Sequence, residues 1–433
     1  MSVVELEPPP VSLPAPVTTL RIVLLGYGRI GQAVAELARA NRARLLAAGV
    51  DLHFIRALVR DPEKSRSGPI LPLTDAPDDA LAGADVAIEV LGGVEPARTL
   101  VARALEAGVP VISANKTLVA TCGPELVAIA RRRRTAFAYE AAVLAGVPFV
   151  GALQRRPLAA DASRLEGIVN GTSNFILSAM ATGAAFAEAL RTAIAHGYAE
   201  PESDADISGR DAAEKLTILL RLCGWPDAST SRLPRTGIDV VTADDVRAAA
   251  ELGGAIRPVA IAVLDATRGG DSGAWVGPAF VPHGHPLAGI TGVGNALRIL
   301  GPGPRAMTFS GPGAGPEVTA ATLLDDLVEV AGASPRSAAT LPEPPPRTGA
   351  GELGRPPAGR WFIGLRTSTG SDAAHVIALL TKHGVSPVHV SRSGDRLHLL
   401  TLDAPWRIVS DARRLLAAIG LRPVVLPALA TSL

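Results

Sequence analysis

A run of carboxylates followed by a lysine is the part of the sequence best suited to moving a proton. Residues 197–206 carry four carboxylates in a predicted loop, and a predicted helix containing Asp211 and Lys215 follows. Lys215 lies four residues after Asp211, so both share one helix face. Apolar neighbours such as Leu216 indicate a partly buried setting for the amine. An amine held there can give a proton to a reacting oxygen or accept one, so the segment predicts an acid/base centre.

A helix cap is a competing explanation for part of this segment. Ser208 with Asp211 fits a capping box, and the helix dipole favours acids in the first turn, so a cap explains Asp211 equally well. Lys215 is harder to dismiss because arginine, which cannot release a proton, is the usual cation of this chain. Among 42 Lys and Arg residues only four are lysines, namely Lys64, Lys116, Lys215 and Lys382.

A glycine-rich turn near the N-terminus predicts a dinucleotide site. It follows the apolar run 20–25, precedes the helix-forming stretch 33–40, and consists of Gly26, Tyr27, Gly28, Arg29, Ile30 and Gly31. Gly26 permits the tight turn, Gly28 lets backbone N–H groups approach a pyrophosphate, and Gly31 lets the helix pack against its strand. The alternative is an ordinary strand-to-helix turn that binds nothing.

The residues after later strands complete this predicted site. The second strand ends at Arg60, which suits a 2′-phosphate and favours NADP, although Asp61 beside it leaves NAD open. The strand predicted over 86–91 is followed by Gly92, and the strand predicted over 109–113 is followed by Lys116. Parallel sheets place ligands at the carboxyl ends of their strands, so we expect Lys116 to face the site, with a surface lysine as the alternative.

Two further turns are less specific. The segment 170–174 precedes a helix and offers donors, among them Asn170 and Thr172, either for a substrate carboxylate or for a plain helix cap. The segment 140–148 contains glycine and proline after a strand, and its composition indicates only a turn between domains.

The order of these elements predicts an α/β protein of three domains. Strands and helices alternate over residues 18–150, which predicts a Rossmann-type doubly wound parallel sheet, to which the chain is expected to return near 315–340. We expect a mixed α/β domain over 151–341, a Pro- and Gly-rich linker over 342–359, and a small ferredoxin-like domain over 360–433. Residues 1–17 are Pro-rich and are interpreted as a disordered leader.

Composition excludes several other classes of protein. The formal net charge is +1 and aromatic residues make up 3% of the chain, which argues against a nucleic-acid partner. No apolar stretch is long enough to span a bilayer, and the N-terminus lacks a signal or transit pattern, so we expect no membrane association and a cytoplasmic location. Cys122 and Cys223 are far apart and are expected to remain reduced thiols.

Together these segments resemble the homoserine dehydrogenase family over roughly residues 20 to 335. The motifs occur in the family's order, and the last is the specific one: Gly26–Gly31, Ala114–Lys116, Tyr139–Pro148, Val169–Asn174, and Gly197–Pro201 with Asp206, Asp211 and Lys215. The resemblance implies NAD(P)H-dependent interconversion of aspartate 4-semialdehyde and homoserine, as in threonine and methionine biosynthesis. It also implies a homodimer formed through the second domain.

The resemblance also assigns roles to individual residues. Lys215 would donate or accept the proton, and Asp206 and Asp211 would orient the substrate or the lysine. Glu200 would hold the substrate ammonium, and Lys116 would lie between nicotinamide and substrate. The remaining carried-over residues are Gly197 and Gly315 near the cofactor, and Glu140, Val143, Ala145 and Val147 as oxygen ligands of a monovalent cation, expected to be sodium.

Two segments depart from the family pattern. Pro312 stands inside the glycine-rich segment 310–315. The C-terminal unit is similar to a diverged ACT-type regulatory domain, but 367–372 lacks the Pro-Gly turn before the helix. The alternatives to a homoserine dehydrogenase are a related amino-acid dehydrogenase, such as one acting on aspartate, and a catalytically silent NADP-binding sensor of an amino acid.

Overall fold

The computed structural model describes residues 17–155, 161–200, 204–264, 272–301, 306–332, 353–367 and 370–430. The predictions for residues 1–16 of the leader and 342–352 of the linker therefore lie outside the described residues. The described chain forms two β-sheets, one of six strands and one of nine.

The strands of both sheets are β1 (Thr18–Leu25), β2 (Val50–Leu58), β3 (Leu73–Thr74), β4 (Val86–Glu89), β5 (Val111–Ser113), β6 (Phe137–Ala138), β7 (Arg164–Ile168), β8 (Gly254–Val263), β9 (Gly273–Pro282), β10 (Gly294–Leu300), β11 (Ala306–Pro312), β12 (Arg360–Arg366), β13 (Pro387–Ser393), β14 (Arg396–Thr401) and β15 (Val424–Ala428).

The α-helices are α1 (Arg29–Ala40), α2 (Arg42–Ala47), α3 (Pro77–Ala80), α4 (Ala97–Glu106), α5 (Lys116–Arg133), α6 (Val150–Arg155), α7 (Gly171–Ala181), α8 (Phe186–Ala195), α9 (Asp204–Ile207), α10 (Arg210–Leu222), α11 (Ala243–Glu251), α12 (Pro316–Gly332), α14 (Gly370–Lys382) and α15 (Trp406–Ala418). Short 3₁₀ turns include η1 (Glu140–Ala142), η2 (Ile238–Val240) and η4 (Pro286–Gly289).

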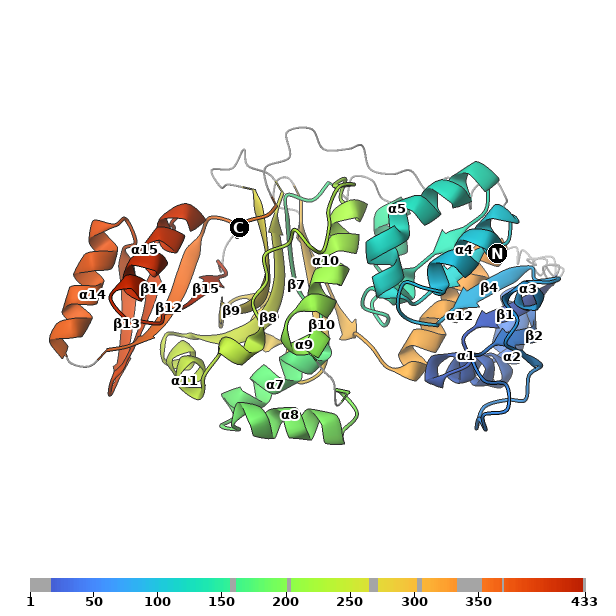
Figure 1. Ribbon diagram of the computed structural model, residues 1–433, viewed down its shortest axis with the longest axis horizontal. Coiled ribbons are helices and arrows are strands. Elements are labelled where there is room, and N and C mark those ends of the chain that lie inside the picture. The colour runs from blue at the N-terminus through green and yellow to red at the C-terminus, as the bar shows by residue number, and fades with distance from the viewer. Residues whose placement is uncertain are drawn as a thin grey trace, which may run out of the picture.

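The first sheet is parallel throughout, with the strand order β3-β2-β1-β4-β5-β6. Alternate residues of β1 face opposite layers, as the period of a strand requires: Ile22 packs with α1 and α12, whereas Val23 packs with α4 and α5. Both faces are thus buried, which explains the continuous apolar run of β1. This arrangement confirms the predicted doubly wound sheet, and Figure 1 shows it at one end of the molecule.

The chain returns to this sheet after the second part of the fold. Ala320, Leu323 and Leu327 of α12 join the core that contains Ile22 and Val34. This face of the sheet is apolar and needs a second helix beside α1 to exclude water from it. The helix α12 therefore belongs to the core of the first sheet, although β7 to β11 precede it in the sequence.

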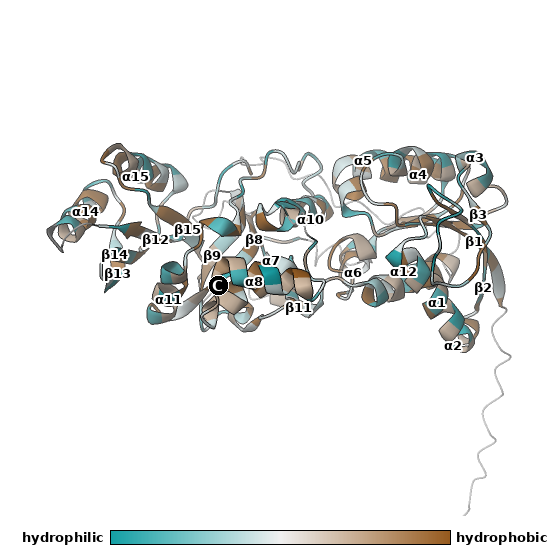
Figure 2. Cartoon of the chain, turned by 60° about the horizontal axis from the view of Figure 1, so that its bottom comes forward, coloured by the Kyte–Doolittle hydropathy of each residue, from teal (hydrophilic) through white to brown (hydrophobic). Residues whose placement is uncertain are grey.

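The second sheet is mixed and continues into the C-terminal unit. Its order is β11-β10-β7-β8-β9-β15-β12-β14-β13, and all neighbours are antiparallel except β15 and β9. Residues 360–428 form the predicted ferredoxin-like β-α-β-β-α-β unit, with α14 and α15 on one side of the strands (Figure 1). Figure 2 colours much of β12 and β15 brown, because their residues are mostly apolar.

The C-terminal unit is attached more closely than a domain after a linker would suggest. Ala428 pairs with Phe280, and the Phe280 and Phe362 rings stack with centroids 6.0 Å apart. His398 also bonds Asp245 at 2.9 Å, and both side chains are buried. The unit therefore shares its sheet and part of its core with the second domain, which local sequence patterns do not reveal.

Some predicted element boundaries differ from the structure. The strand predicted over 109–113 begins at Val111, and the helix after it begins at Lys116, because Asn115 caps its N-terminus through its side-chain oxygen. The predicted glycine loop 310–315 is partly strand, since Ser310 to Pro312 pair with β10. The described chain contains no helix long and apolar enough to cross a membrane.

A buried ionic cluster supports the second sheet. Glu166 on β7 is 2% exposed and accepts from Arg164 at 2.5 Å, His285 at 3.0 Å and Arg298 at 3.0 Å. Burial alone would raise the pKa of Glu166, but the bond from His285 and the positive charges around it lower the pKa to about 2. The carboxylate therefore remains charged because its partners replace the water that it loses.

We expect Glu166→Gln to lower the free energy of unfolding by about 3 kcal/mol, since it leaves buried cations without their partner. Glu166 is protonated in the unfolded chain below about pH 4.3, so its contribution is complete above that pH and is lost as pH falls toward 2. Urea unfolding at pH 7 measures the loss. The exposed Glu188→Gln is the matched control and should change stability by less than about 0.5 kcal/mol; equal losses in both variants would contradict this account.

Candidate active site

The centre of the candidate site is one aspartate held between two lysines. Asp211 on α10 accepts from Lys116 through one carboxylate oxygen and from Lys215 through the other, each at 2.9 Å. Lys116 is the first residue of α5, which belongs to the first sheet, whereas α10 covers the second sheet. The carboxylate therefore joins the two halves of the protein at the point where both lysines meet.

Lys215 is fixed by a second contact. Its Nζ donates to the carbonyl of Val169 at 2.7 Å, at the end of β7. The residue is 8% exposed, and Asp211 is 4% exposed. An ammonium has three protons to donate, and these two contacts use two of them, so one remains for a ligand oxygen.

Asp211 does not form the capping box that the sequence allowed. The N-cap of α10 is Gly209, which has a φ of 76° and makes no side-chain cap bond. Glycine adopts this left-handed backbone without strain, and it turns the chain directly from α9 into α10. Because the cap needs no carboxylate, Asp211 is available to the lysines.

Asn170 holds the carboxylates in place. As the N-cap of α7 it accepts from the Ser173 N–H at 2.8 Å, and its Nδ2 donates to Asp206 at 2.7 Å and to Asp211 at 2.8 Å. Asn170 therefore acts as a helix cap, and its amide group donates to the protein's own carboxylates. The Thr172 hydroxyl likewise donates to the carbonyl of Tyr198 and supports the loop after α8.

A buried carboxylate missed by sequence reasoning positions Lys116. Glu89, at the end of β4, is fully buried and accepts from Ser113 at 2.5 Å, from the Leu91 N–H at 2.8 Å and from Asn115 Nδ2 at 3.2 Å. Burial raises the pKa of Glu89, while these bonds favour its charged form. An acid within the apolar strand before Gly92 was the available signal, because a charge in a buried strand needs partners.

The charged groups of the site shift one another's pKa values. Burial alone would raise the pKa of Asp211, but the Lys215 and Lys116 ammonium groups hold it well below its usual range. The Asp211 charge in turn raises the pKa of Lys116, whose side chain is 42% exposed. Burial raises the pKa of Asp206. Asp211 thus stays ionised, and its charge favours the charged form of Lys116.

The glycine turn has the geometry that its residues predict. Gly26 has a φ of 109° and an added Cβ would lie 2.9 Å from the Val90 oxygen, while a Cβ on Gly31 would lie 2.4 Å from the Gly26 oxygen. Gly28, the N-cap of α1, has open space on its Cβ side and makes no side-chain cap bond. The N-terminus of α1, with Arg29 and Ile30 in its first turn, therefore has N–H groups and room for a phosphate.

A loop after β2 is tied to this turn. The Tyr27 hydroxyl donates to the Pro69 carbonyl, and Gln32 accepts from the Gly68 N–H at 2.8 Å. Arg60 is exposed at the start of this loop. A basic side chain therefore follows the strand end at which a dinucleotide ribose lies in this type of fold.

The other predicted residues lie on exposed or flanking turns. Gly92 follows β4, which lies beside β1 and β5, and its φ is 77°. Gly197 follows α8 with a φ of 72°, and Gly315 precedes α12 with a φ of 130°. Glu200 is exposed and directly precedes residues 201–203, which the structure does not describe. Among the described residues it makes no contact with Lys215.

The predicted cation loop uses its acid as a helix cap. The Glu140 carboxylate accepts the N–H groups of Phe149, Val150 and Gly151 at 2.7–2.8 Å. The carbonyl of Ala145 accepts from the Thr322 hydroxyl, and Val143 and Val147 lie fully or almost fully buried on either side of it. Among the described residues no group of three or more His, Cys, Asp or Glu side chains is arranged to hold a metal.

An additional acid adjoins this loop. Asp326 on α12 accepts from the Glu140 N–H at 3.2 Å. Burial, together with the nearby Glu140 charge, raises the pKa of Asp326 to about 8. The loop is thus an oxygen-rich, electronegative setting in which a hard cation would relieve repulsion.

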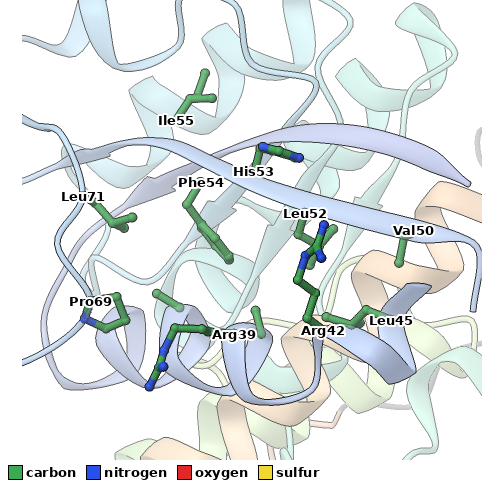
Figure 3. Close-up of a pocket in the computed structure, with 12 residues that line it drawn as sticks. Arg39, Arg42, Leu45, Val50, Leu52, His53, Phe54, Ile55, Pro69 and Leu71 are labelled. Carbon is green, nitrogen blue, oxygen red and sulfur yellow. The ribbon is translucent and has the colours of Figure 1, made fainter. Parts of the chain in front are cut away.

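A pocket of about 390 Å³ lies away from the lysine cluster. Figure 3 shows Leu52 and Phe54 of β2 facing Arg39, Arg42 and Leu45 of the helices α1 and α2. None of its lining residues is a predicted site residue, so this cavity is not the candidate active site.

Two family models match the chain. The model described as "Homoserine dehydrogenase, NAD binding domain" matches residues 26–140, and the model described as "Homoserine dehydrogenase" matches residues 148–328. Each range contains one half of the candidate site, with Lys116 in the first and Lys215 in the second.

Individual relatives agree with the family models. The chain is 38% identical over 317 residues to a homoserine dehydrogenase of Mycobacterium tuberculosis, covering 72% of each chain. It is 37% identical over 326 residues to that of Corynebacterium glutamicum, covering 73% of each. A crystal structure of a homoserine dehydrogenase from Thiobacillus denitrificans superimposes with a TM-score of 0.85 at 30% identity, covering 96% of this chain and all of the other.

We expect Asp211→Asn to lower the free energy of unfolding by about 3 kcal/mol at pH 7, because it leaves a buried ammonium unpaired. Since folding lowers the pKa of Asp211, its contribution is complete above the unfolded value of about 3.9 and is lost as pH falls below it. The difference between variant and parent should be equal at pH 7 and 5 and smaller at pH 3.5. Urea unfolding measures it, with the exposed pair variant Asp411→Asn as control; a difference that grows on acidification would refute the assignment.

Proposed function

The chain belongs to the homoserine dehydrogenase family, and from that premise we propose that it interconverts homoserine and aspartate 4-semialdehyde with Lys215 as the proton donor and acceptor. It is an NAD(P)-dependent oxidoreductase. The observation that carries the proposed role of Lys215 is the paired contact of Asp211 with Lys116 and Lys215, which gathers two ammonium groups where the two halves of the fold meet.

The chemistry requires a proton at the substrate oxygen. The nicotinamide, when bound, supplies or takes up the hydride at carbon. Reduction of an aldehyde builds negative charge on its oxygen, and the third proton of the Lys215 ammonium neutralises that charge as it develops. In the oxidative direction the neutral amine takes the proton from the homoserine hydroxyl. Val169 and Asp211 hold the nitrogen in one orientation for both directions.

Other residues bind and orient the substrate in this proposal. Lys116, which is half-exposed, lies between nicotinamide and substrate, and Glu200 binds the substrate ammonium. Asp211 orients the lysines through its ion pairs, and Asn170 holds Asp206 and Asp211 in position around them. Asn170 and Thr172 act on the substrate indirectly, because their polar groups already bond to the protein.

We further propose NADP as the preferred cofactor. Its diphosphate binds at the N-terminus of α1, where Gly28 is open, and Gly92, Gly197 and Gly315 flank it. Arg60 binds the 2′-phosphate, for which an acid would be unsuitable. This choice is tested by comparing kcat/KM for NADP and NAD.

We also propose a homodimer formed through the second domain, located in the cytoplasm. The C-terminal ferredoxin-like unit is proposed to be ACT-like. Because β15 of this unit pairs with β9, an effector such as threonine bound to the unit would act directly on the sheet that contains β7, the strand before Val169.

The function is tested by following NADPH absorbance while the protein oxidises homoserine with NADP. We expect turnover in the parent chain and a loss of about 100-fold or more in kcat for Lys215→Ala, with substrate KM changed little, as for a missing general acid/base. The exposed Lys382→Ala is the control and should match the parent. Equal turnover in Lys215→Ala would remove this amine from the mechanism.

A bound sodium ion, held by the carbonyls of Val143, Ala145 and Val147 with Glu140, should raise the melting temperature. We expect a higher Tm in sodium chloride than in choline chloride at equal ionic strength, because an ion that binds only the folded state stabilises it. Measured at pH 9, where Asp326 with its pKa of about 8 is ionised, the gain should shrink in Asp326→Asn, which removes a nearby negative charge, and should persist in Asp411→Asn. Equal Tm values in the two salts would exclude the ion.

A further inference from the structure

A third carboxylate, outside the roles described so far, adjoins the lysine pair. Glu214 on α10 accepts from the Thr117 hydroxyl at 3.0 Å. Thr117 follows Lys116 in the first turn of α5, and Glu214 stands three residues after Asp211, on a neighbouring position of the same helix face. Successive residues of α5 thus bind successive acids of α10.

We propose that Glu214 is a positioning residue that, through Thr117 and through its own negative charge, holds the Lys116 ammonium against Asp211 and across the junction of the two halves of the site. The proposal rests on the proposed function for its effect on turnover. The contact itself can be tested without any activity.

Glu214 adds a negative charge on the Lys116 side of the cluster. Lys116 and Lys215 bring two positive charges to Asp211, which supplies one negative charge. Asp206 and Glu214 supply two more, and both act on Lys116 by charge, in addition to the stronger effect of Asp211. Because Asp211 is shared with Lys215, a carboxylate on the side of Thr117 favours Lys116 in particular.

The position of Glu214 carries a desolvation free energy that a solvent-exposed acid would not have. The side chain is half-buried, and burial raises the pKa of Glu214, whereas the Thr117 bond and the Lys116 charge lower it. A solvated glutamate at this helix position would avoid that cost by turning outward. The observed side chain is instead directed to the first turn of α5.

The interface between α5 and α10 contains a further polar contact. Arg221, two turns after Glu214, donates to the carbonyl of Val119 on α5 at 3.1 Å. The Lys116, Thr117 and Val119 contacts run in order along both helices. Glu214 lies between the other two, so its loss should change the placement of Lys116 while Arg221 still holds the helices together.

Competitive acetylation tests the contact, because acetic anhydride reacts only with a deprotonated amine. The chain has four lysines, so mass spectrometry of their peptides measures each one separately. In Glu214→Gln, which keeps an acceptor for Thr117 and removes the charge, we expect Lys116 to react about three- to tenfold faster at pH 9, as for the loss of a nearby opposite charge. Lys64 and Lys382, which are exposed, should be unchanged.

Two other variants separate the effect of the Thr117 hydrogen bond from the effect of the Glu214 charge and from general effects on folding. Thr117→Val keeps the charge and removes the hydrogen bond, and we expect a smaller increase of about two- to threefold in Lys116 labelling. Glu188→Gln removes an exposed glutamate on α8 and should label as the parent does. The Tm of each variant is measured alongside, and Thr117→Val decides the question if Glu214→Gln does not fold.

Steady-state kinetics tests the consequence for the reaction. We expect kcat to fall about five- to twentyfold in Glu214→Gln, with KM for homoserine within about twofold of the parent. Unchanged labelling of Lys116 in both variants would overturn the proposal, and so would altered labelling with unchanged kcat. A parent chain that does not oxidise homoserine would instead contradict the proposed function, while the labelling result would still decide whether Glu214 holds Lys116.

Discussion

The ion pairs of Asp211 with Lys116 and Lys215 are the constraint on which the site depends. Each carboxylate oxygen bonds one ammonium, and each ammonium comes from a different part of the fold. Such a buried anion is stable only while both partners stay in place. The positions of α5 and α10 are therefore coupled, and so are the glycine turn on the first sheet and Lys215 beside the second.

The fold meets this constraint by placing polar groups at the ends of buried strands. Glu89 ends β4 and fixes the cap of α5 through Asn115, while Val169 follows β7 and fixes Lys215. Strand ends are well suited to this task because the sheet holds their backbone while the next residue leaves the apolar layer. Gly209 then turns α9 into α10 so that Asp211 faces inward.

Sequence reasoning predicted the larger features because they depend on local patterns. The strand, glycine turn and helix of residues 20–40 follow from residue type alone, and so do the same-face spacing of Asp211 and Lys215 and the ferredoxin-like order after residue 360. It gave a helix cap and the lysine pair equal weight at Asp211, left Asn170 open between a ligand site and a helix cap, and missed Glu89. Each of these three features depends on hydrogen-bond or ion-pair partners that are distant in sequence. Which partner a side chain bonds is set by proximity and burial in the folded chain.

By itself, the sequence predicted most of the strands and helices and singled out the glycine turn and Lys215 as candidates for a diphosphate site and a proton donor, since periodicity, glycine positions and side-chain chemistry are local properties. Only the tertiary structure decided that Lys116 meets Lys215 across Asp211, that α12 covers the first sheet, and that β15 joins β9. These contacts join residues that are far apart in the chain. They form because folding buries apolar faces and pairs buried charges, and both effects require the whole chain to be folded.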